Sequence, residues 1–387
     1  MPNVYPASEY DEDRVSAFFY EGLPYQGRET RIFAYYGHPR TVSGQKSPAV
    51  VLVHGGAGTA FKEWVRLWNE RGYAALAMDL EGHVPSPEWQ LKECLQLSGH
   101  PWSGPEKQGV FTDYMAPVSD QWMYHAVAAV LSGHSLLRSF AEVDSQRVGM
   151  TGISWGGIIT SLAAGLDDRL SFAMPVYGCG FLHEPGSLYG AAIAGMPPEA
   201  VLQTRLLWDP STYLPESKLP MLWLNSSRDT HFPLSIFIRS YDLNRSNQPA
   251  SRLSIRDGMG HSYQEGCTAQ ELFAFADSVV KDSMPLPQIG DVLRQGEEIV
   301  VHYNAAYPAV KAQLYWCSDR LSRQDAGWTA TDAVLDGAIS KATARLPAGA
   351  SSFFMNITDA RGLIASTRVM TNRGQDKDIK EHTANEA

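Results

Sequence analysis

Residues 147–157 read RVGMTGISWGG, and this stretch decides the fold. The apolar run at 147–151 predicts a buried strand, and the small residues at 156–165 predict a helix. Between them, GISWG at 152–156 follows the pattern G-x-S-x-G, which is typical of a tight strand-to-helix turn that exposes a serine. The two glycines are needed because side chains there would clash with the adjoining strand and helix. We therefore predict that Ser154 is a nucleophile at the end of a sheet strand.

Apolar β-type runs alternate with helical patterns along the first three quarters of the chain. The predicted strands are Thr30–Tyr36, Ala49–Val53, Ala74–Met78, Phe172–Val176, Pro220–Leu224 and Ser251–Ile255. The predicted helices are Phe61–Arg71, Ser119–Phe140, Pro233–Tyr241 and Thr268–Lys281. This alternation indicates an α/β protein with a mostly parallel central sheet and helices on both faces. Combined with the serine turn, it predicts the α/β-hydrolase fold.

The same patterns predict how the chain divides into domains. Residues 1–285 form the expected catalytic domain, interrupted by irregular insertions at 81–117 and 179–198. Both insertions follow the carboxyl ends of strands, where α/β sheets bind ligands, so we expect lid-like loops. Residues 288–373 are rich in β-type runs and turn signals, which predict a small antiparallel β-sandwich. The polar residues at 374–387 are expected to form a flexible tail.

A serine hydroxyl is a weak nucleophile and needs a base, which in this fold follows an acid along the chain. His261 lies in a glycine-rich turn just after the predicted strand at 251–255, where the base should emerge. Asp229 follows the strand at 220–224 and would orient the imidazole. Asp257 is the alternative acid, although it lies on the same turn as His261.

Backbone donors and aromatic side chains complete the expected site. HGGAG at 54–58, after the first apolar strand, is typical of an oxyanion-hole loop. The backbone N–H groups of Gly56, Ala57 and Trp155 are therefore predicted to bind the developing oxyanion. Trp155 follows the nucleophile and is predicted to line the substrate pocket, together with Trp89, Trp102 and Trp122.

Composition restricts the classes of partner. The chain has 387 residues, of which 44% are hydrophobic and 19% charged, so it can bury a large core. Its formal net charge of -10 argues against nucleic acid and anionic membrane surfaces, because both require a basic patch. It contains no run of about 20 apolar residues, so no membrane span is expected. A small-molecule or carbohydrate ester is the expected substrate, and a homo-oligomer is compatible with the sequence.

The N-terminus and the cysteines bear on compartment and cofactors. Residues 1–14 are polar and acidic and lack the features of a signal peptide. The chain as it stands is expected in the cytoplasm, or in the periplasm or secreted if a signal precedes it. Its four cysteines show no C-x-x-C spacing, so we expect buried free thiols and no metal or cofactor. They are Cys94, Cys179, Cys267 and Cys317.

Several short segments together resemble the group that contains the acetyl xylan esterases and relatives of dienelactone hydrolase. They are YEGLPY at 20–25, DQW at 120–122, GISWGG at 152–157, PVYGCG at 175–180 and LWDP at 207–210. The resemblance spans roughly residues 15–285. It implies hydrolysis of ester bonds, and deacetylation of carbohydrate, by a Ser-His-Asp triad. The resemblance implies that the residues of this triad are Ser154, Asp229 and His261.

Two departures define the alternatives. Dienelactone hydrolases proper use a cysteine nucleophile, so Ser154 indicates the serine esterase branch. The form G-x-S-x-G-G is also similar to that of prolyl-oligopeptidase-type peptidases, but these carry a β-propeller for which the chain has no room. The predicted enzyme is a serine carboxylic ester hydrolase, with a serine peptidase or amidase as the alternative and a non-catalytic carbohydrate-binding homologue as the third. The C-terminal β domain resembles one appended in some related hydrolases.

Overall fold

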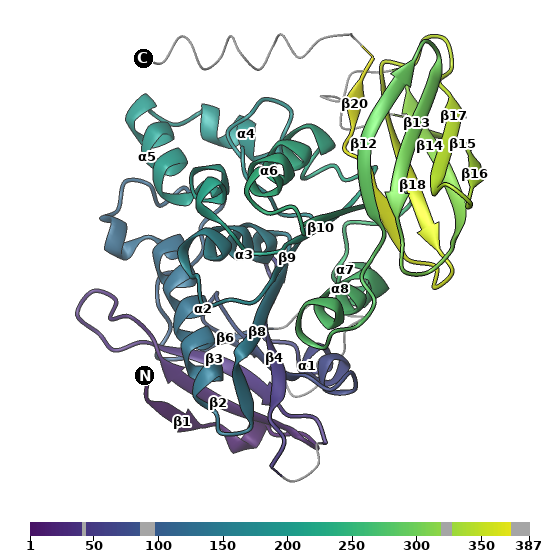
Figure 1. The fold of residues 1–387 in the computed structure, drawn as a ribbon. Coiled ribbons are helices and arrows are strands. Elements are labelled where there is room, and N and C mark those ends of the chain that lie inside the picture. Colours follow the sequence, from purple (N-terminus) through teal and green to yellow (C-terminus); the bar gives the residue numbers. More distant parts are fainter. Residues whose placement is uncertain (41–43, 86–96, 319–326, 373–387) are drawn as a thin grey trace.

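A nine-stranded sheet forms the centre of the larger domain in the computed structural model (Figure 1), which describes residues 1–40, 44–85, 97–318 and 327–372. The strand order is β1-β2-β3-β5-β4-β8-β9-β10-β11. The strands from β5 to β11 in this order are parallel, and β1, β2 and β3 extend the sheet in antiparallel fashion. The strands are Val4–Pro6 (β1), Val15–Glu21 (β2), Arg31–Gly37 (β3), Ser47–Val53 (β4), Ala74–Met78 (β5), Val143–Ile153 (β8), Ala173–Val176 (β9), Leu222–Ser226 (β10) and Arg252–Arg256 (β11).

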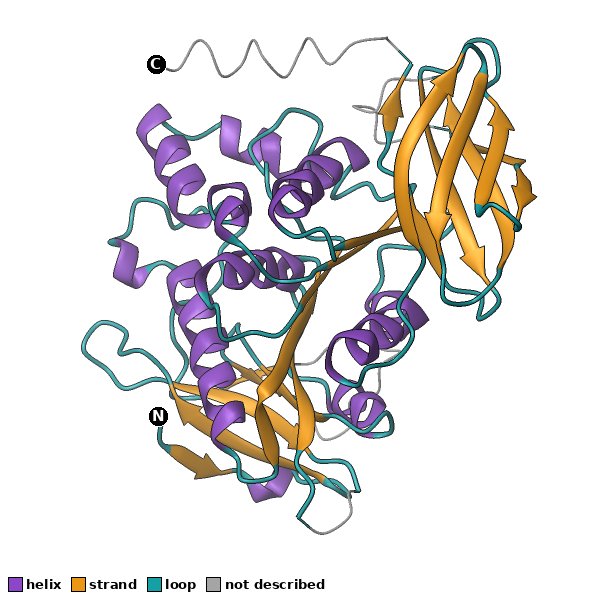
Figure 2. Ribbon diagram, viewed as in Figure 1, coloured by secondary structure: helices purple, strands orange, loops and turns teal. Residues whose placement is uncertain are grey.

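Helices cover both faces of this sheet, as predicted for the α/β-hydrolase fold (Figure 2). Helices α2 (Trp122–Ser139), α3 (Trp155–Leu166) and α6 (Leu234–Asn247) lie on one face. Helices α1 (Lys62–Asn69), α7 (Tyr263–Thr268) and α8 (Gln270–Val280) lie on the other. Because both faces are covered, every residue of β4 and β5 is buried, which explains their continuous apolar sequences.

The N-terminal segment and the insertions differ from a plain alternation. Strands β1 and β2 were not predicted. They extend the sheet beyond β3, in the order β1-β2-β3. The insertion at 81–117 contains the short strand pair β6 (His83–Val84) and β7 (Ser98–Gly99), while residues 86–96 lie outside the described part. The insertion at 179–198 contains helix α4 (Leu188–Ala194), and helix α5 (Pro198–Trp208) follows it. The lid-like role of both insertions stays a prediction.

The C-terminal part consists of two antiparallel sheets, as the β-rich sequence predicts. The first has the order β12-β13-β17-β16, and the second has the order β15-β14-β18-β19, with β20 paired to β18. Apolar side chains such as Ile299, Leu314 and Met355 fill the space between the sheets. The predicted tail at 374–387 lies outside the described residues. The strands are Gln288–Gln295 (β12), Glu298–Asn304 (β13), Ala309–Cys317 (β14), Thr329–Asp332 (β15), Val334–Asp336 (β16), Lys341–Arg345 (β17), Ser352–Asp359 (β18), Ile364–Ser366 (β19) and Met370–Thr371 (β20).

The second of these sheets also packs against the larger domain. Tyr315 and Phe354 stack with ring centroids 4.9 Å apart, and both belong to the same continuous core as the central sheet. At the edge strand β11, the Ile255 N–H donates to Ser366 Oγ (2.7 Å) and the Ile255 carbonyl accepts from Asn356 Nδ2 (2.9 Å). The β domain therefore covers a sheet edge whose backbone groups would otherwise be unpaired.

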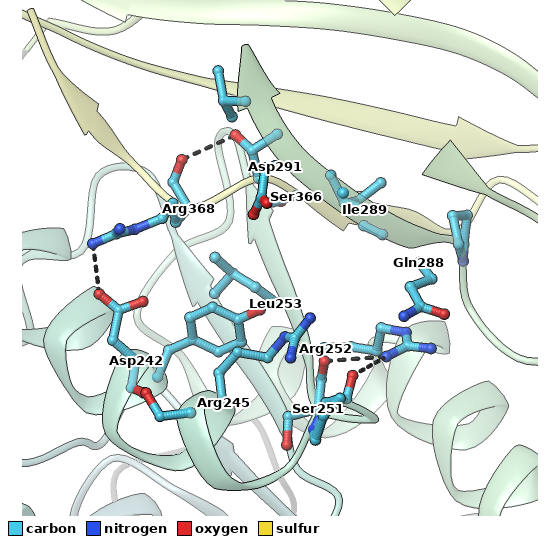
Figure 3. Close-up of a pocket in the computed structure, with 18 residues that line it drawn as sticks. Asp242, Arg245, Ser251, Arg252, Leu253, Gln288, Ile289, Asp291, Ser366 and Arg368 are labelled. Atoms are coloured by element: carbon cyan, nitrogen blue, oxygen red, sulfur yellow. Dashed lines mark hydrogen bonds and ion pairs between the residues drawn. The ribbon is translucent and has the colours of Figure 1, made fainter. Parts of the chain in front are cut away.

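A cleft of about 570 Å³ lies where the two domains meet, beside the amino end of β11 (Figure 3). Asp242 and Arg245 line it from helix α6, and Ile289 lines it from β12. Arg368 closes one side through an ion pair with Asp242 (2.8 Å). Because His261 follows the opposite, carboxyl end of β11, this cleft is separate from the site around Ser154.

Candidate active site

Ser154 occupies the turn between β8 and α3 in a strained backbone conformation. Its φ of 58° and ψ of -114° are rare for a residue with a side chain. The turn is fixed because the Ser154 N–H donates to the Val176 carbonyl (3.0 Å) and the Ser154 carbonyl accepts from Ile158 N (3.0 Å). A Cβ atom on Gly156 would overlap the carbonyl of Val53, so packing against β4 requires this glycine of the motif.

His261 is held next to this serine by the turn that follows β11. Its Nε2 lies 3.1 Å from Ser154 Oγ. Tyr177 supports the ring: the two ring centroids are 4.5 Å apart, and the Tyr177 hydroxyl donates to the Gly260 carbonyl (2.7 Å). Sequence reasoning assigned no role to Tyr177. Its position depends on a positive φ of 63° just after β9, which no local pattern signals.

Asp229 lies on the other side of the imidazole and is 5% exposed. Its Oδ2 lies 2.7 Å from His261 Nδ1, and its Oδ1 accepts hydrogen bonds from His231 N (2.7 Å) and Phe232 N (2.8 Å). With Nδ1–H donating to the carboxylate, Nε2 is free to accept the serine proton. Asp257 instead accepts from the Ser227 hydroxyl (2.8 Å), so the structure brings Asp229, and not its alternative, to His261.

Two of the three predicted oxyanion donors are free in the described part of the chain, one in the loop at 54–58 and one at the start of helix α3. Among the described residues, no hydrogen-bond partner is found for the backbone N–H of Gly56 or Trp155. The Ala57 N–H, in contrast, donates to Glu81 Oε1 (3.1 Å) and is occupied. The His54 ring braces the loop, because its Nδ1–H donates to the Gly55 carbonyl (2.6 Å) and its Nε2 accepts from Leu80 N (2.9 Å).

Aromatic rings enclose Trp155 beside the nucleophile. Its ring centroid lies 5.3 Å from those of Phe111 and Tyr189 and 5.5 Å from that of Trp122. Trp122 is itself buried, and its indole N–H donates to the Leu80 carbonyl (2.7 Å), so it supports the Trp155 ring.

Trp102, another of the predicted pocket tryptophans, does not join this cluster. The Trp102 ring packs against Phe19 (5.5 Å between centroids) and Arg31, on the N-terminal strands. None of the ring contacts found for Trp102 in the described part of the chain involves a residue at Ser154. Trp89 lies outside the described residues.

Tyr189, from helix α4, is a site residue that sequence reasoning missed. Burial raises the pKa of Tyr189 well above its ordinary value, and a hydrogen bond with the Ser154 side chain partly offsets this rise. The Tyr189 ring also lies 5.2 Å from that of Phe232, next to Asp229 on the chain. The second insertion therefore reaches the nucleophile. The only sequence signal was its position after the carboxyl end of a strand.

His231 stacks on His261 with ring centroids 4.2 Å apart and an angle of 32°. Burial lowers the pKa of His231 and the neighbouring His261 lowers it further, while Asp229 acts in the opposite direction. Asp229, His231 and His261 offer three possible metal ligands within 4.8 Å of one another. Both ring nitrogens of His261 are already engaged, Nδ1 with Asp229 Oδ2 (2.7 Å) and Nε2 with Ser154 Oγ (3.1 Å), so the group fits a triad better than a metal site.

The cysteines that the structure describes are buried. Cys179 and Cys267 are free thiols, as expected, and burial raises the pKa of Cys267 to about 12. Cys317 is also buried, and Cys94 lies outside the described residues.

Comparison with known families supports the sequence resemblance. Residues 6–184 match the family model of acetyl xylan esterase (AXE1), which confirms the resemblance over that segment. The segment includes Ser154 and the loop at 54–58 but ends before Asp229 and His261. No match was found among curated protein sequences. None of the helices in the described ranges is long and apolar enough to cross a membrane.

Solved structures with the same fold include two kinds of enzyme. An acetyl xylan esterase from Paenibacillus sp. R4 has a TM-score of 0.51 at 20% identity, covering 72% of this chain and 88% of that one. The uncomplexed acylaminoacyl peptidase of Pyrococcus horikoshii has a TM-score of 0.50 at 19% identity, covering 69% of this chain and 42% of the peptidase. At this identity the likeness shows the α/β-hydrolase fold alone.

Proposed function

We propose that this serine carboxylic ester hydrolase removes acetyl groups, or similarly small acyl groups, from a carbohydrate or another small alcohol. The observation that carries the proposal is the hydrogen-bonded line from Ser154 Oγ through His261 to Asp229, with distances of 3.1 Å and 2.7 Å. The match of residues 6–184 to the acetyl xylan esterase family supports the choice of acetyl esters.

The geometry supports a two-step acyl transfer. Ser154 Oγ attacks the ester carbonyl carbon while His261 Nε2 takes the serine proton. The N–H groups of Gly56 and Trp155 stabilise the tetrahedral oxyanion. The C–O bond to the alcohol then breaks, and His261 returns the proton to the departing oxygen. Water repeats these steps on the acyl-serine and releases the carboxylic acid.

Asp229 assists by holding one tautomer of His261 and stabilising the imidazolium form. Its second oxygen is saturated by two backbone N–H groups, so the carboxylate cannot turn away from the ring. In this role, Asp229→Asn should lower kcat by about 10,000-fold, because the amide favours the wrong tautomer. The same change at Asp257 should have little effect, since that carboxylate contacts Ser227 and Arg228.

The rings near the nucleophile favour a short acyl group. The Tyr189 ring packs between those of Trp155 and Phe232, beside the nucleophile. These rings are buried, and moving them to admit a long acyl chain would disrupt their mutual packing. Acetyl esters require no such movement.

Replacing Ser154 tests the nucleophile. Ser154→Ala should lower kcat for p-nitrophenyl acetate by at least about 1,000-fold and abolish labelling by a fluorophosphonate probe. Ser161→Ala is the matched control, because Ser161 is a buried serine of helix α3, which begins just after Ser154, and it is not at the site. Undiminished turnover by folded Ser154→Ala would overturn the assignment.

A substrate panel then tests the acyl group and the bond type. We expect acetylated sugars to be hydrolysed faster than the same sugars with butyryl or longer acyl groups, and faster than aminoacyl p-nitroanilides. Fast cleavage of the anilides with slow ester hydrolysis would favour the peptidase alternative instead.

A further inference from the structure

Lys107 places a positive charge next to the oxyanion loop. Its side chain is 15% exposed, and its Nζ lies 4.8 Å from the ring centroid of Trp155 and 5.5 Å from that of Trp122. The same Nζ is 3.2 Å from the point where a Cβ atom of Gly56 would stand. A Cβ atom built on Gly55 would stand 3.3 Å from Ser154 Cβ. The ammonium and the nucleophile therefore lie beside adjacent residues of the loop.

Within the described residues, this ammonium keeps N–H donors that have no hydrogen-bond acceptor. Glu81 Oε1 is 3.9 Å from Nζ, which is too long for a hydrogen bond, and the same oxygen already accepts the Ala57 N–H. Among the residues that the structure describes, no hydrogen-bond acceptor is found for Lys107 Nζ. An ammonium has three N–H donors, and a mostly buried charge is costly unless those donors find acceptors.

The surroundings nevertheless hold the ammonium in place. The indole rings attract a cation through their π faces but accept no conventional hydrogen bond. Gly56 leaves room for the lysine head, because a Cβ atom there would stand only 3.2 Å from Lys107 Nζ. The result is a cation that is positioned beside the oxyanion loop with its donors open.

We propose that Lys107 binds a carboxylate of the substrate, so that the enzyme prefers esters that carry an acid group close to the scissile bond. The inference rests on the proposed function, because the ester must still be attacked by Ser154. A protein with a net charge of -10 repels anions on average, so an acidic substrate requires a local cation of this kind. The carboxylate belongs either to the alcohol, as in a uronic acid, or to the acyl group, as in a dicarboxylic half-ester.

Two matched pairs of esters distinguish these sources. O-acetyl glucuronic acid against O-acetyl glucose tests an acid on the alcohol, and p-nitrophenyl hemisuccinate against p-nitrophenyl butyrate tests an acid on the acyl group. For wild-type enzyme, we expect the acidic member of one pair to have the higher kcat/KM. Lys107→Met should lower kcat/KM for that member about 10- to 100-fold, mainly through KM, because a charge-assisted contact made before and during the reaction is lost. The neutral member should change by less than about 3-fold.

Controls separate this contact from general charge and from folding. Lys311→Met, an exposed residue on β14, makes the same change in net charge and should leave both pairs unchanged. Lys107→Arg should keep the preference for the acidic ester. In wild-type enzyme, 1 M NaCl should reduce that preference, a measurement that needs no variant.

The proposal is overturned if wild-type enzyme shows no acid preference in either pair, or if Lys107→Met slows both members equally. Either result would leave the proposed function intact as long as hydrolysis of the neutral esters still depends on Ser154.

Discussion

At the residue scale, His134 and Asp167 form a buried pair away from the active site. His134 Nδ1 lies 2.8 Å from Asp167 Oδ2, which also accepts from Arg169 Nη2 (2.6 Å). Burial lowers the pKa of His134 and outweighs the opposite effect of Asp167. For Asp167, burial acts to raise the pKa, but the hydrogen bonds from His134 and Arg169 hold it below the ordinary range. Both groups therefore bind protons more readily in the unfolded chain.

This pair predicts that the free energy of unfolding falls on acidification. The His134 contribution starts as pH drops below 6.5, where the unfolded ring gains a proton and the buried ring does not. The Asp167 contribution is present above its ordinary pKa of 3.8 and is lost as pH falls toward the lower folded pKa. His134→Gln should flatten the decline between pH 7 and pH 5, while it costs about 1–3 kcal/mol at pH 7 through weakened hydrogen bonding.

Urea unfolding at a series of pH values measures this effect. His302→Gln is the matched control, because His302 is exposed on β13 and should leave the slope unchanged. Equal slopes for wild type and His134→Gln between pH 7 and pH 5 would contradict the assignment.

The residues of the candidate site divide into those that sequence reasoning reached and those it missed. Ser154, Asp229 and His261 each follow a recognisable strand, so their order predicted that they would meet. Tyr189 and Lys107 come from insertions. Their contacts depend on the path of an irregular segment, which the hydrophobic periodicity of the sequence does not predict. Ala57 shows the same limit, because its N–H was predicted to be free and is bonded to Glu81 from a distant loop.

At the scale of elements, the loop between β4 and α1 depends on a contact from outside itself. Ala57 has a positive φ of 58°, which is strained for alanine, and the Glu81 carboxylate bonds its N–H. This bond holds the turn that carries the Gly56 N–H, the donor that we propose binds the oxyanion. In that mechanism, Glu81 is a positioning residue.

Glu81→Ala should therefore lower kcat for p-nitrophenyl acetate about 10-fold with a smaller change in KM, because a loosened donor acts mainly on the transition state. Glu81→Gln keeps an acceptor and should recover most of the rate. Glu106→Ala, at an exposed position of the same insertion, serves as the control. A change in KM alone, with kcat preserved, would refute the positioning role.

The elements themselves were predicted most closely where both faces of a strand are buried. The predicted strand at 74–78 coincides with β5, and helix α3 extends the predicted span by one residue at each end. Strand β2 was missed because it pairs only with other antiparallel strands and has no helix beside it in sequence to mark the alternation. Sequence periodicity thus identified the parallel part of the sheet better than its antiparallel extension.

At the scale of the whole molecule, the β domain completes the edge of the catalytic sheet. The Ile255 N–H donates to Ser366 Oγ, the Ser366 hydroxyl donates to Asn356 Oδ1 (2.6 Å), and Asn356 Nδ2 donates to the Ile255 carbonyl. These two side chains bond the backbone groups of β11 as a neighbouring strand would, and both are buried. The sequence predicted a separate β domain, but it could not show this contact, because side chains and not a strand ladder make it.

Breaking this cycle of hydrogen bonds should destabilise the strand that leads to His261. Asn356→Leu and Ser366→Ala should each cost about 1–3 kcal/mol, because each leaves a buried backbone group of Ile255 unpaired. The double variant should cost less than the sum of the two, since the three groups form one network. Arg345→Ala, which removes an exposed ion pair between β17 and Glu297, is the control. Because β11 precedes the turn that holds His261, the temperature at which activity is lost should fall together with the unfolding temperature. Strictly additive costs, or a loss of stability with no effect on the inactivation temperature, would show that the β domain does not support the active site through β11.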